Sequence, residues 1–358
     1  MLNNIYKEFH DTIIKEIAND RIFTDSLHTL AYGTDASFYR LIPRIVIKAI
    51  DEKEVSLILK YAHKQNLSVV FRAAGTSLSG QAITDSILVV CNFGWRGIEV
   101  LNEAKQIKLQ PGVVGAHANV ALKYFGKKIG PDPASINSAQ IGGIAANNAS
   151  GMCCGKDKNS YKTLKDIRII LNDGTILDTS DETSKQEFLN SKSELVSQIK
   201  ELVNEIKEDK KLYNKIVRKY SIKNTTGYSL NALIDFENEI DIIAHLMIGS
   251  EGTLGFISSI TYNTVEEPKV KASSIILFED IFEACKFVAD LKQEKELVNA
   301  AELMDRASLK SIEDKEGVDP LYKTLHDDVA SILVECGGTS QDDLEEKISQ
   351  VKQISQNY

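Results

Sequence analysis

The sequence predicts an α+β protein with a large first domain and a smaller second one, and three observations lead to this prediction. Short apolar strands and amphipathic helices are interspersed with glycine-rich loops through the first part of the chain. The pattern changes at Glu266-Glu267-Pro268. Beyond this point strands and helices alternate regularly, as in a layered α/β domain. We therefore expect a helical leader at 1–42, a first domain at 43–265 and a second domain at 268–358.

Composition and charge exclude several classes of protein. Of the 358 residues, 43% are hydrophobic and 26% are charged, which is ordinary for a globular protein. The net charge of −9 argues against a nucleic-acid partner, because phosphates bind basic surfaces. The N-terminus lacks the apolar stretch of a signal peptide, and no run reaches the roughly 18 apolar residues of a transmembrane segment. Five cysteines without a CxxC motif indicate neither a zinc ribbon nor an iron–sulfur cluster. We therefore expect a cytoplasmic, reduced protein.

Periodicity and turn residues predict the elements of the first domain. Apolar residues at Val55, Ile58, Leu59 and Ala62 have helical spacing. Asp173-Gly174 between two apolar runs indicates a tight hairpin turn. The highly charged stretch 181–220 has helical periodicity and is expected to be a solvated helical excursion. In chain order we expect a helix at 54–66, strands at 68–72, 87–90 and 106–109, a helix at 115–127 and a hairpin at 167–177.

The second domain is predicted to repeat strand and helix three times. We expect strands at 273–278, 298–303 and 329–335 and helices at 280–293, 306–312 and 342–354. A ferredoxin-like α/β layer of this kind requires one more strand. The sequence therefore predicts an incomplete ferredoxin-like domain.

Four glycine-containing segments are candidates for chemistry. The first, 72–81, follows a strand, and its small residues let backbone N–H groups point at an anion. A phosphate-binding loop and a plain strand-to-helix turn are equally good interpretations of this segment alone. It matches neither the Walker nor the Rossmann glycine motif.

The other three segments differ in how specific they are. Residues 130–135 carry two prolines around Asp132, which predicts a rigid loop. Residues 141–151 have almost no bulk, which favours contact with a large ligand over the close packing of two backbones. Residues 249–257 have a glycine at every third position before a strand, and a tight turn is the simplest interpretation.

In this order the four segments resemble the FAD-binding domain of the vanillyl-alcohol oxidase and p-cresol methylhydroxylase (PCMH) superfamily. The similarity is closer to its D-lactate dehydrogenase, glycolate oxidase and D-2-hydroxyglutarate dehydrogenase branch. It runs from about Pro43 to the chain end and implies a PCMH-type FAD-binding domain of two subdomains, followed by a partial substrate cap domain. The runs 150–155, 159–163, 222–230 and 302–305 are similar to large bacterial members fused to an iron–sulfur half.

The resemblance also implies which residues contact the cofactor. Gln81 follows Gly80 where members with covalent flavin have a histidine, which implies non-covalent attachment. A contact through the Cys153 backbone is expected, although Cys153 and Cys154 have the simpler interpretation of small buried thiols. The implied FAD-binding residues are Arg72, Ala74, Gly75, Thr76, Ser77, Gly80, Gln81, Pro131, Asp132, Ser135, Gly142, Gly143, Asn147, Ser150, Gly151, Cys153, Glu251, Gly255 and Ile257.

Substrate and catalytic residues are less well specified. Lys223 and Thr226 are the candidates for holding a substrate carboxylate, because Ile222 occupies the place where related dehydrogenases have an arginine. The Gly-His-x-Gly-Asp-Gly-Asn motif that supplies the family's catalytic histidine and metal ligands has no counterpart here. Of the six histidines, His245 alone is expected near the flavin, without a catalytic role. No catalytic residue and no metal ligand is assigned.

The resemblance implies FAD-dependent oxidation of a D-2-hydroxy acid, such as D-lactate, glycolate or D-2-hydroxyglutarate, by hydride transfer to flavin N5. We expect this chain to be the FAD-binding portion and to turn over substrate poorly or not at all by itself. Iron–sulfur clusters, a divalent metal and an electron-transfer partner at the inner membrane are expected only in a longer relative or a partner subunit. Two alternatives stay open: a catalytically inactive FAD-binding module or truncated subunit, and another oxidoreductase of the PCMH fold.

Overall fold

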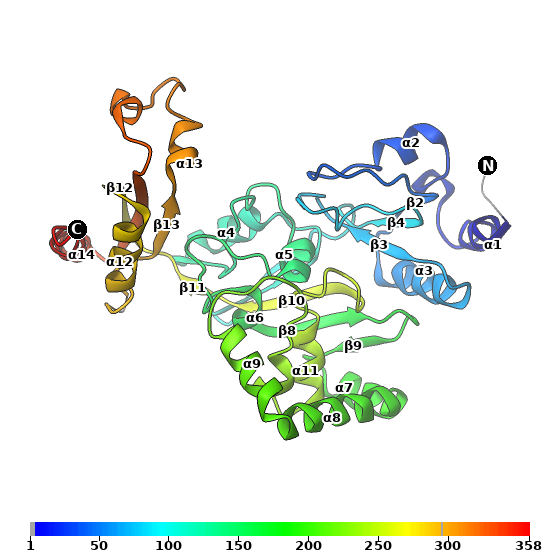
Figure 1. The fold of residues 1–358 in the computed structure, drawn as a ribbon. Helices are drawn as coiled ribbons and strands as arrows, with labels where there is room; N and C mark the ends of the chain where they lie inside the picture. Colours follow the sequence, from blue (N-terminus) through cyan, green and yellow to red (C-terminus); the bar gives the residue numbers. More distant parts are fainter. Residues whose placement is uncertain (1–3, 295) are drawn as a thin grey trace. The chain divides into compact units, whose positions relative to one another are not determined.

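The protein is described from a computed structural model, which covers residues 4–294 and 296–358 (Figure 1). The chain divides into two compact units, residues 1–265 and 266–358. The fold mixes helices and strands, as the sequence predicts. Among the described residues, no helix combines the length and the apolar character that crossing a bilayer requires.

The first unit begins with a four-stranded sheet in the order β1-β2-β4-β3. Strands β2 (Ile45–Lys48), β4 (Ile87–Val90) and β3 (Val69–Arg72) are parallel, and β1 (Ile22–Phe23) pairs antiparallel with β2. All four residues of β4 are buried, because the central strand of a parallel sheet is covered on both faces.

Helices α1 (Asn4–Ile13), α2 (Ser26–Ala31) and α3 (Glu52–Lys64) accompany this sheet (Figure 1). The expected helical leader thus also contains the 3-10 turn η1 (Asn19–Arg21) and the strand β1. The bidentate ion pair between Arg21 and Glu54, with both N–O distances at 2.6 Å, fixes this segment against α3.

The second sheet is antiparallel, in the order β5-β6-β10-β8-β9. Its central strand β10 (Phe256–Asn263) lies between strands that precede it by many residues in the sequence. The flanking strands are β5 (Ile98–Leu101), β6 (Gln106–Leu109), β8 (Leu164–Ile170) and β9 (Ile176–Asp178). The predicted hairpin joins β8 to β9, and Gly174 at its turn has φ +85°.

Helices cover this second sheet and complete its core. The charged excursion forms α7 (Glu182–Ser191), α8 (Ser193–Glu208) and α9 (Lys210–Tyr220), with apolar residues of α8 buried at helical spacing. The other helices are α4 (Gly115–Lys123), α5 (Ile141–Asn147), α6 (Ser160–Thr163), α10 (Ala232–Asp235) and α11 (Glu239–Leu246).

One expectation for this region needs correction. The helix expected at 115–127 ends at Lys123, because Gly126 has φ +66° and the chain then enters the short strand β7 (Lys127–Lys128), which pairs with β11 (Val265–Glu266). The first seven residues of the glycine-rich segment 141–151 form α5. Backbone hydrogen bonds to neighbouring segments fix this helix despite the low helix propensity of its two glycines.

Polar and aromatic contacts join the two sheets of the first unit. Arg168 on β8 donates to both carboxylate oxygens of Glu52 on α3, at 2.7 and 2.9 Å, and Ser258 on β10 donates to the same carboxylate at 2.6 Å. Beside them, Phe71 at the end of β3 packs on Phe256 of β10 with 4.7 Å between ring centroids. These contacts set the distance between the edges that carry the candidate site.

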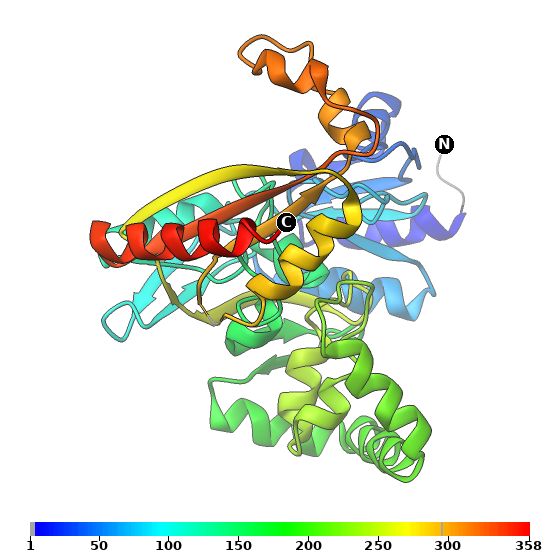
Figure 2. The ribbon, with the colours of Figure 1, turned by 60° about the vertical axis from the view of Figure 1, so that its left-hand side comes forward.

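The second unit is a three-stranded antiparallel sheet in the order β12-β14-β13. The strands are β12 (Val270–Phe278), β13 (Ala300–Met304) and β14 (Ala330–Gly338). Helices α12 (Ile281–Leu291) and α14 (Gln341–Ser355) pack side by side against β12 and β14 (Figure 2), while α13 (Arg306–Lys310) and η2 (Pro320–Thr324) lie in the connection from β13 to β14. The predicted alternation of strands and helices is therefore present.

Candidate functional site

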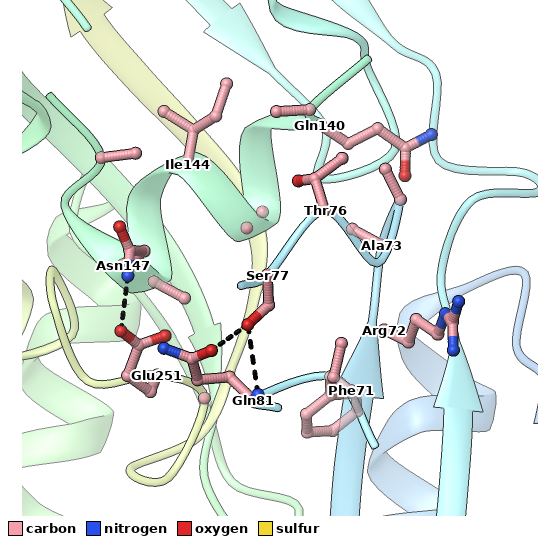
Figure 3. A pocket seen from close by; sticks show the side chains of 18 of the residues that line it. Phe71, Arg72, Ala73, Thr76, Ser77, Gln81, Gln140, Ile144, Asn147 and Glu251 are labelled. Carbon is pink, nitrogen blue, oxygen red and sulfur yellow. Dashed lines mark hydrogen bonds between the residues drawn. The ribbon is translucent and has the colours of Figure 1, made fainter. Parts of the chain in front are cut away.

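A pocket of about 430 Å³ lies in the first unit where its two sheets meet (Figure 3). All four glycine-containing segments of the sequence contribute to its lining. They come from the end of β3, the loop between β7 and α5, the α5 region and the loop that leads into β10. Segments far apart in the sequence thus form one concave surface, which is where cofactors bind in folds of this kind.

The first loop is held open by an anchored arginine. Arg72 ends β3, and its Nη1 donates to the carbonyl oxygens of Thr34 at 2.6 Å and Tyr32 at 3.3 Å. Gly75 has φ +72°, and a Cβ added there would lie 2.6 Å from Nη2 of Arg72. Only glycine therefore fits at this turn, since both the backbone conformation and the guanidinium exclude a side chain.

Hydrogen bonds within the loop fix its second half. The Ser77 hydroxyl accepts from the backbone N–H groups of Ser79 and Gln81, both at 3.2 Å. The same hydroxyl contacts the Gln81 amide oxygen, so Ser77 and Gln81 are joined through backbone and side chain (Figure 3). This arrangement orients the Gln81 side chain along the pocket wall.

Helix α5 forms the opposite wall. The N–H of Gly142 donates to the Pro111 carbonyl at 2.9 Å, and a Cβ at Gly142 would lie 2.7 Å from Pro111 Cβ. At Gly143, by contrast, an added Cβ would meet nothing within 4 Å. Gly142 is therefore small because the protein packs against it, whereas Gly143 faces open space.

The loop before β10 closes the far end of α5. The backbone N–H groups of Gly249 and Glu251 donate to the carbonyls of Ala145 at 3.2 Å and Ala146 at 2.8 Å. These bonds satisfy carbonyl groups that a helix leaves unpaired at its C-terminus. They also direct the Glu251 side chain toward the pocket.

Glu251 is a partly buried carboxylic acid in the pocket wall. Asn147 Nδ2 donates to Glu251 Oε1 at 2.6 Å, and the Gln81 side chain lies beside this carboxylate (Figure 3). Burial raises the pKa of Glu251 above its ordinary value, and the amide groups of Asn147 and Gln81 only partly offset the effect. The backbone of Glu251 has φ +52°, which is uncommon for a residue other than glycine.

Three charged side chains line the pocket among the described residues: Arg72, Lys223 and Glu251. Burial lowers the pKa of Arg72, which stays far above neutrality. Lys223 Nζ donates to the Gly151 carbonyl at 3.2 Å. The Oε1 atom of Gln140 is buried in the lining and has no hydrogen-bond partner in the described part of the chain, which leaves an acceptor for a bound ligand.

Most of the residues that the sequence analysis associates with the cofactor line this pocket. They are Arg72, Ala74, Gly75, Thr76, Ser77, Gln81, Ser135, Gly142, Gly143, Asn147, Ser150, Glu251, Gly255 and Ile257. Of the two candidates for substrate binding, Lys223 lines the pocket and Thr226 does not. The Thr226 hydroxyl donates to Asn224 at 2.7 Å, and the neighbouring Thr225 lines the pocket instead.

Five expected cofactor residues do not line the pocket: Gly80, Pro131, Asp132, Gly151 and Cys153. Gly151 has a clear structural reason to be glycine, since an added Cβ would lie 1.4 Å from the Asp132 carbonyl oxygen. This part of the segment is therefore small because two backbones pack closely. Gly80 similarly accommodates the ring of Tyr39, 3.2 Å from an added Cβ.

Several lining residues lie outside the sequence-based assignments: Phe71, Pro111, Gln140, Ile144 and Thr225. Phe71 and Gln140 each precede a glycine-containing segment by one position and Thr225 adjoins Thr226, so extending each assignment by one position would have found them. Pro111 carries no local signal, because only the packing of α5 against the loop before α4 brings it to the wall.

His245 does not line the pocket. Its ring stacks on Phe236 with 3.9 Å between centroids, and Nδ1 lies 2.7 Å from the Asp241 carbonyl oxygen. Burial lowers the pKa of His245, which favours its neutral form. The buried thiol of Cys154 likewise has a raised pKa, which makes it a poor nucleophile.

Comparison with known proteins gives two family matches. Residues 43–180 match the FAD binding domain family, and residues 267–358 match the C-terminal domain of FAD linked oxidases. One match therefore falls within each of the two units that the structure separates.

Curated relatives are similar over most of this chain. D-lactate dehydrogenase [cytochrome] 1 of Saccharomyces cerevisiae is 27% identical over 88% of the chain and 45% of its own length. D-2-hydroxyglutarate dehydrogenase of Haemophilus influenzae is 30% identical over 70% of the chain and 25% of its own length. Glycolate oxidase subunit GlcD of Bacillus subtilis is 23% identical over 87% and 56%. The chain thus spans only about a quarter to a half of these relatives.

Solved structures share the fold. An alkyldihydroxyacetonephosphate synthase superimposes with a TM-score of 0.68 at 15% identity, over 98% of this chain and 60% of that chain. The BBE-like 1 protein of Physcomitrella patens gives a TM-score of 0.59 at 13% identity, over 96% of this chain and 59% of that chain.

Proposed function

This chain belongs to the FAD-linked oxidases of the vanillyl-alcohol oxidase and p-cresol methylhydroxylase superfamily, and we propose that its pocket binds FAD non-covalently for the oxidation of a D-2-hydroxy acid. The observation that carries the proposal is the convergence of four small-residue segments on one pocket. Gln81 lines it at the position where covalent members have a histidine, and an amide forms no bond to flavin.

The residues of the pocket fit a dinucleotide. The small residues of the first loop let backbone N–H groups approach a pyrophosphate, and the Thr76 hydroxyl adds a donor. The open space at Gly143 provides room for a planar ring, and the unpartnered Gln140 Oε1 provides an acceptor for a ligand N–H or O–H group. We assign these residues to cofactor binding together with the others of the predicted set that line the pocket.

The bound flavin would supply the acceptor at N5 for the C2 hydrogen of the hydroxy acid, transferred as hydride. The chain's own part is to bind and orient. Lys223, whose ammonium group uses one of its three donors on the Gly151 carbonyl, would hold the substrate carboxylate with the others. Thr226 would bind the substrate only if its hydroxyl released Asn224, to which it donates in this structure. We assign no general base to this chain.

We further propose that the whole enzyme acts in the cytoplasm with an iron–sulfur partner or half that receives the electrons. Cys91, Cys154, Cys285 and Cys336 are free thiols, as is usual in a reducing compartment. Because its 358 residues hold no Gly-His-x-Gly-Asp-Gly-Asn run, the isolated chain should oxidise substrate slowly.

An anaerobic titration tests this function. The purified chain should retain FAD through gel filtration, with the flavin absorbance of a bound cofactor. D-lactate, D-2-hydroxyglutarate or glycolate should bleach this absorbance, slowly, in a single turnover, and L-lactate should not. A chain that retains no FAD would contradict the proposed binding.

Two further outcomes separate the alternatives. Retained FAD that no hydroxy acid bleaches would favour a flavin-binding module without catalysis. Bleaching by NADPH would instead favour a different reductase on the same fold.

A further inference from the structure

We infer that Glu251 takes up a proton when FAD enters the pocket, so that the affinity for FAD falls as the pH rises. The inference rests on the proposed function and deepens it, because it assigns Glu251 a role in regulating how the cofactor is bound. Its basis is the position of one carboxylic acid between the two walls of the pocket.

Glu251 connects both walls of the pocket (Figure 3). Asn147, the last residue of α5, donates to Oε1 at 2.6 Å, and the Gln81 side chain of the first loop lies beside the same carboxylate. Gln81 is in turn bonded to Ser77 in the loop that would receive the pyrophosphate. The carboxylate therefore lies one side chain away from the expected position of the phosphates.

No cation neutralises this carboxylate within the described part of the chain. Arg72 is committed to the Tyr32 and Thr34 carbonyls, and Lys223 donates to the Gly151 carbonyl. Helix α5 has no ionisable side chain, and the loop of Glu251 itself has no other. Tyr228, the remaining titratable group beside this loop, is bonded to the Thr253 hydroxyl at 2.7 Å. Glu251 thus meets amide donors only.

Bound FAD would shift the protonation equilibrium of Glu251 toward the neutral acid. Its pyrophosphate carries two negative charges, and like charges disfavour the ionised form of a nearby acid. The cofactor would also exclude water from a carboxyl whose pKa burial already raises. Both effects favour neutral Glu251 in the complex. FAD therefore binds the protonated form more tightly, and by linkage its association constant falls between the pKa of the free acid and that of the bound acid.

The backbone at Glu251 also points to a role for this side chain. Its φ of +52° lies in the left-handed region, which glycine or asparagine adopts more readily. Gly249 and Gly252 on either side have φ +84° and +75° and are glycines. A glutamate in such a turn indicates that its side chain is needed there.

The test is the dissociation constant of FAD, measured by quenching of flavin fluorescence between pH 5 and about pH 8.5 on protein freed of flavin. For the wild type, the affinity should fall by up to about tenfold per pH unit within part of this range. Glu251→Gln should bind FAD with little pH dependence. Glu194→Gln, which alters an exposed carboxylate of α8, should behave as the wild type.

Calorimetry gives an independent readout. Titrations in two buffers of different ionisation enthalpy should show proton uptake for the wild type and for Glu194→Gln, and none for Glu251→Gln. A pH-independent wild-type affinity, proton release, or equal uptake in Glu251→Gln would overturn the inference. Circular dichroism identifies a variant that fails to fold, in which case Glu251→Asp replaces it and should retain the pH dependence. Absence of FAD binding at every pH would overturn the proposed function as well.

Discussion

At the scale of single residues, the pocket depends on glycines that are small for different reasons. Gly75 is constrained by its φ of +72° and by the Arg72 guanidinium, whereas Gly142 is backed by Pro111. Gly143 has open space at its Cβ position. Substitutions at these sites should therefore separate effects on folding from effects on cofactor binding.

Gly75→Ala should destabilise the protein and weaken FAD binding. The new Cβ would lie 2.6 Å from Arg72 Nη2 in a backbone conformation that alanine rarely adopts, at a cost of about 1–3 kcal/mol. Urea unfolding measures the change in the free energy of unfolding. Gly126→Ala is the matched control, since Gly126 has φ +66° with nothing within 4 Å. Equal costs at both sites would show that the Arg72 contact contributes nothing.

Gly143→Val should leave the fold intact and weaken FAD binding by about tenfold or more, because the side chain would occupy space that the cofactor needs. Fluorescence quenching measures the affinity, and circular dichroism the fold. Ser197→Val on the exposed face of α8 serves as the control. An unchanged affinity in Gly143→Val would mean that the cofactor does not lie against α5.

At the scale of secondary-structure elements, the ion pair between Glu52 of α3 and Arg168 of β8 fixes the two sheets of the first unit against each other. Burial tends to raise the pKa of Glu52, but hydrogen bonds from Arg168 and Ser258 outweigh it, so that the pKa is lowered. A carboxyl with a lowered pKa stabilises the folded protein above its unfolded pKa and loses this effect as the pH falls through the folded pKa.

Glu52→Gln should therefore lower the free energy of unfolding by about 1–2 kcal/mol at neutral pH, a value discounted for partial exposure. The difference from the wild type should shrink as the pH falls below about 4.3. Denaturant melts at a series of pH values measure it. Glu99→Gln on the exposed strand β5 should show neither effect. A difference that stays constant with pH would refute the role of the charge.

At the scale of the whole molecule, the two units have separate cores. The cores of the first unit centre on its two sheets, and the core of the second centres on Phe278, Phe287 and Ile332. All residues that line the pocket fall between Phe71 and Ile257, within the first unit.

A fragment of residues 1–265 should therefore fold and bind FAD with an affinity within a few-fold of the full chain. Gel filtration followed by the fluorescence titration checks this expectation. A folded fragment that binds FAD more than about tenfold more weakly would show that the second unit contributes at least 1.4 kcal/mol to binding.

The sequence by itself determined the elements whose signals are local. Periodicity identified α3, β4 and β6, the Asp-Gly pair identified the β8–β9 turn, and the second unit's alternation of strands and helices was found in full. Four glycine-containing segments in a fixed order identified the family and most of the pocket lining. A backbone that faces a ligand closely requires small residues, and runs of such residues can be recognised in the sequence.

Tertiary structure alone decided the rest, because those features depend on partners distant in the chain. The pairing of β10 between β6 and β8 makes one pocket of four segments, and α5 forms where Pro111 and Val113 accept its first N–H groups. The same packing explains Gly151, which is small to admit the Asp132 carbonyl. It also places Glu251 between Asn147 and Gln81. Because Asn147 and Glu251 are 104 residues apart in the sequence, no local pattern encodes their contact.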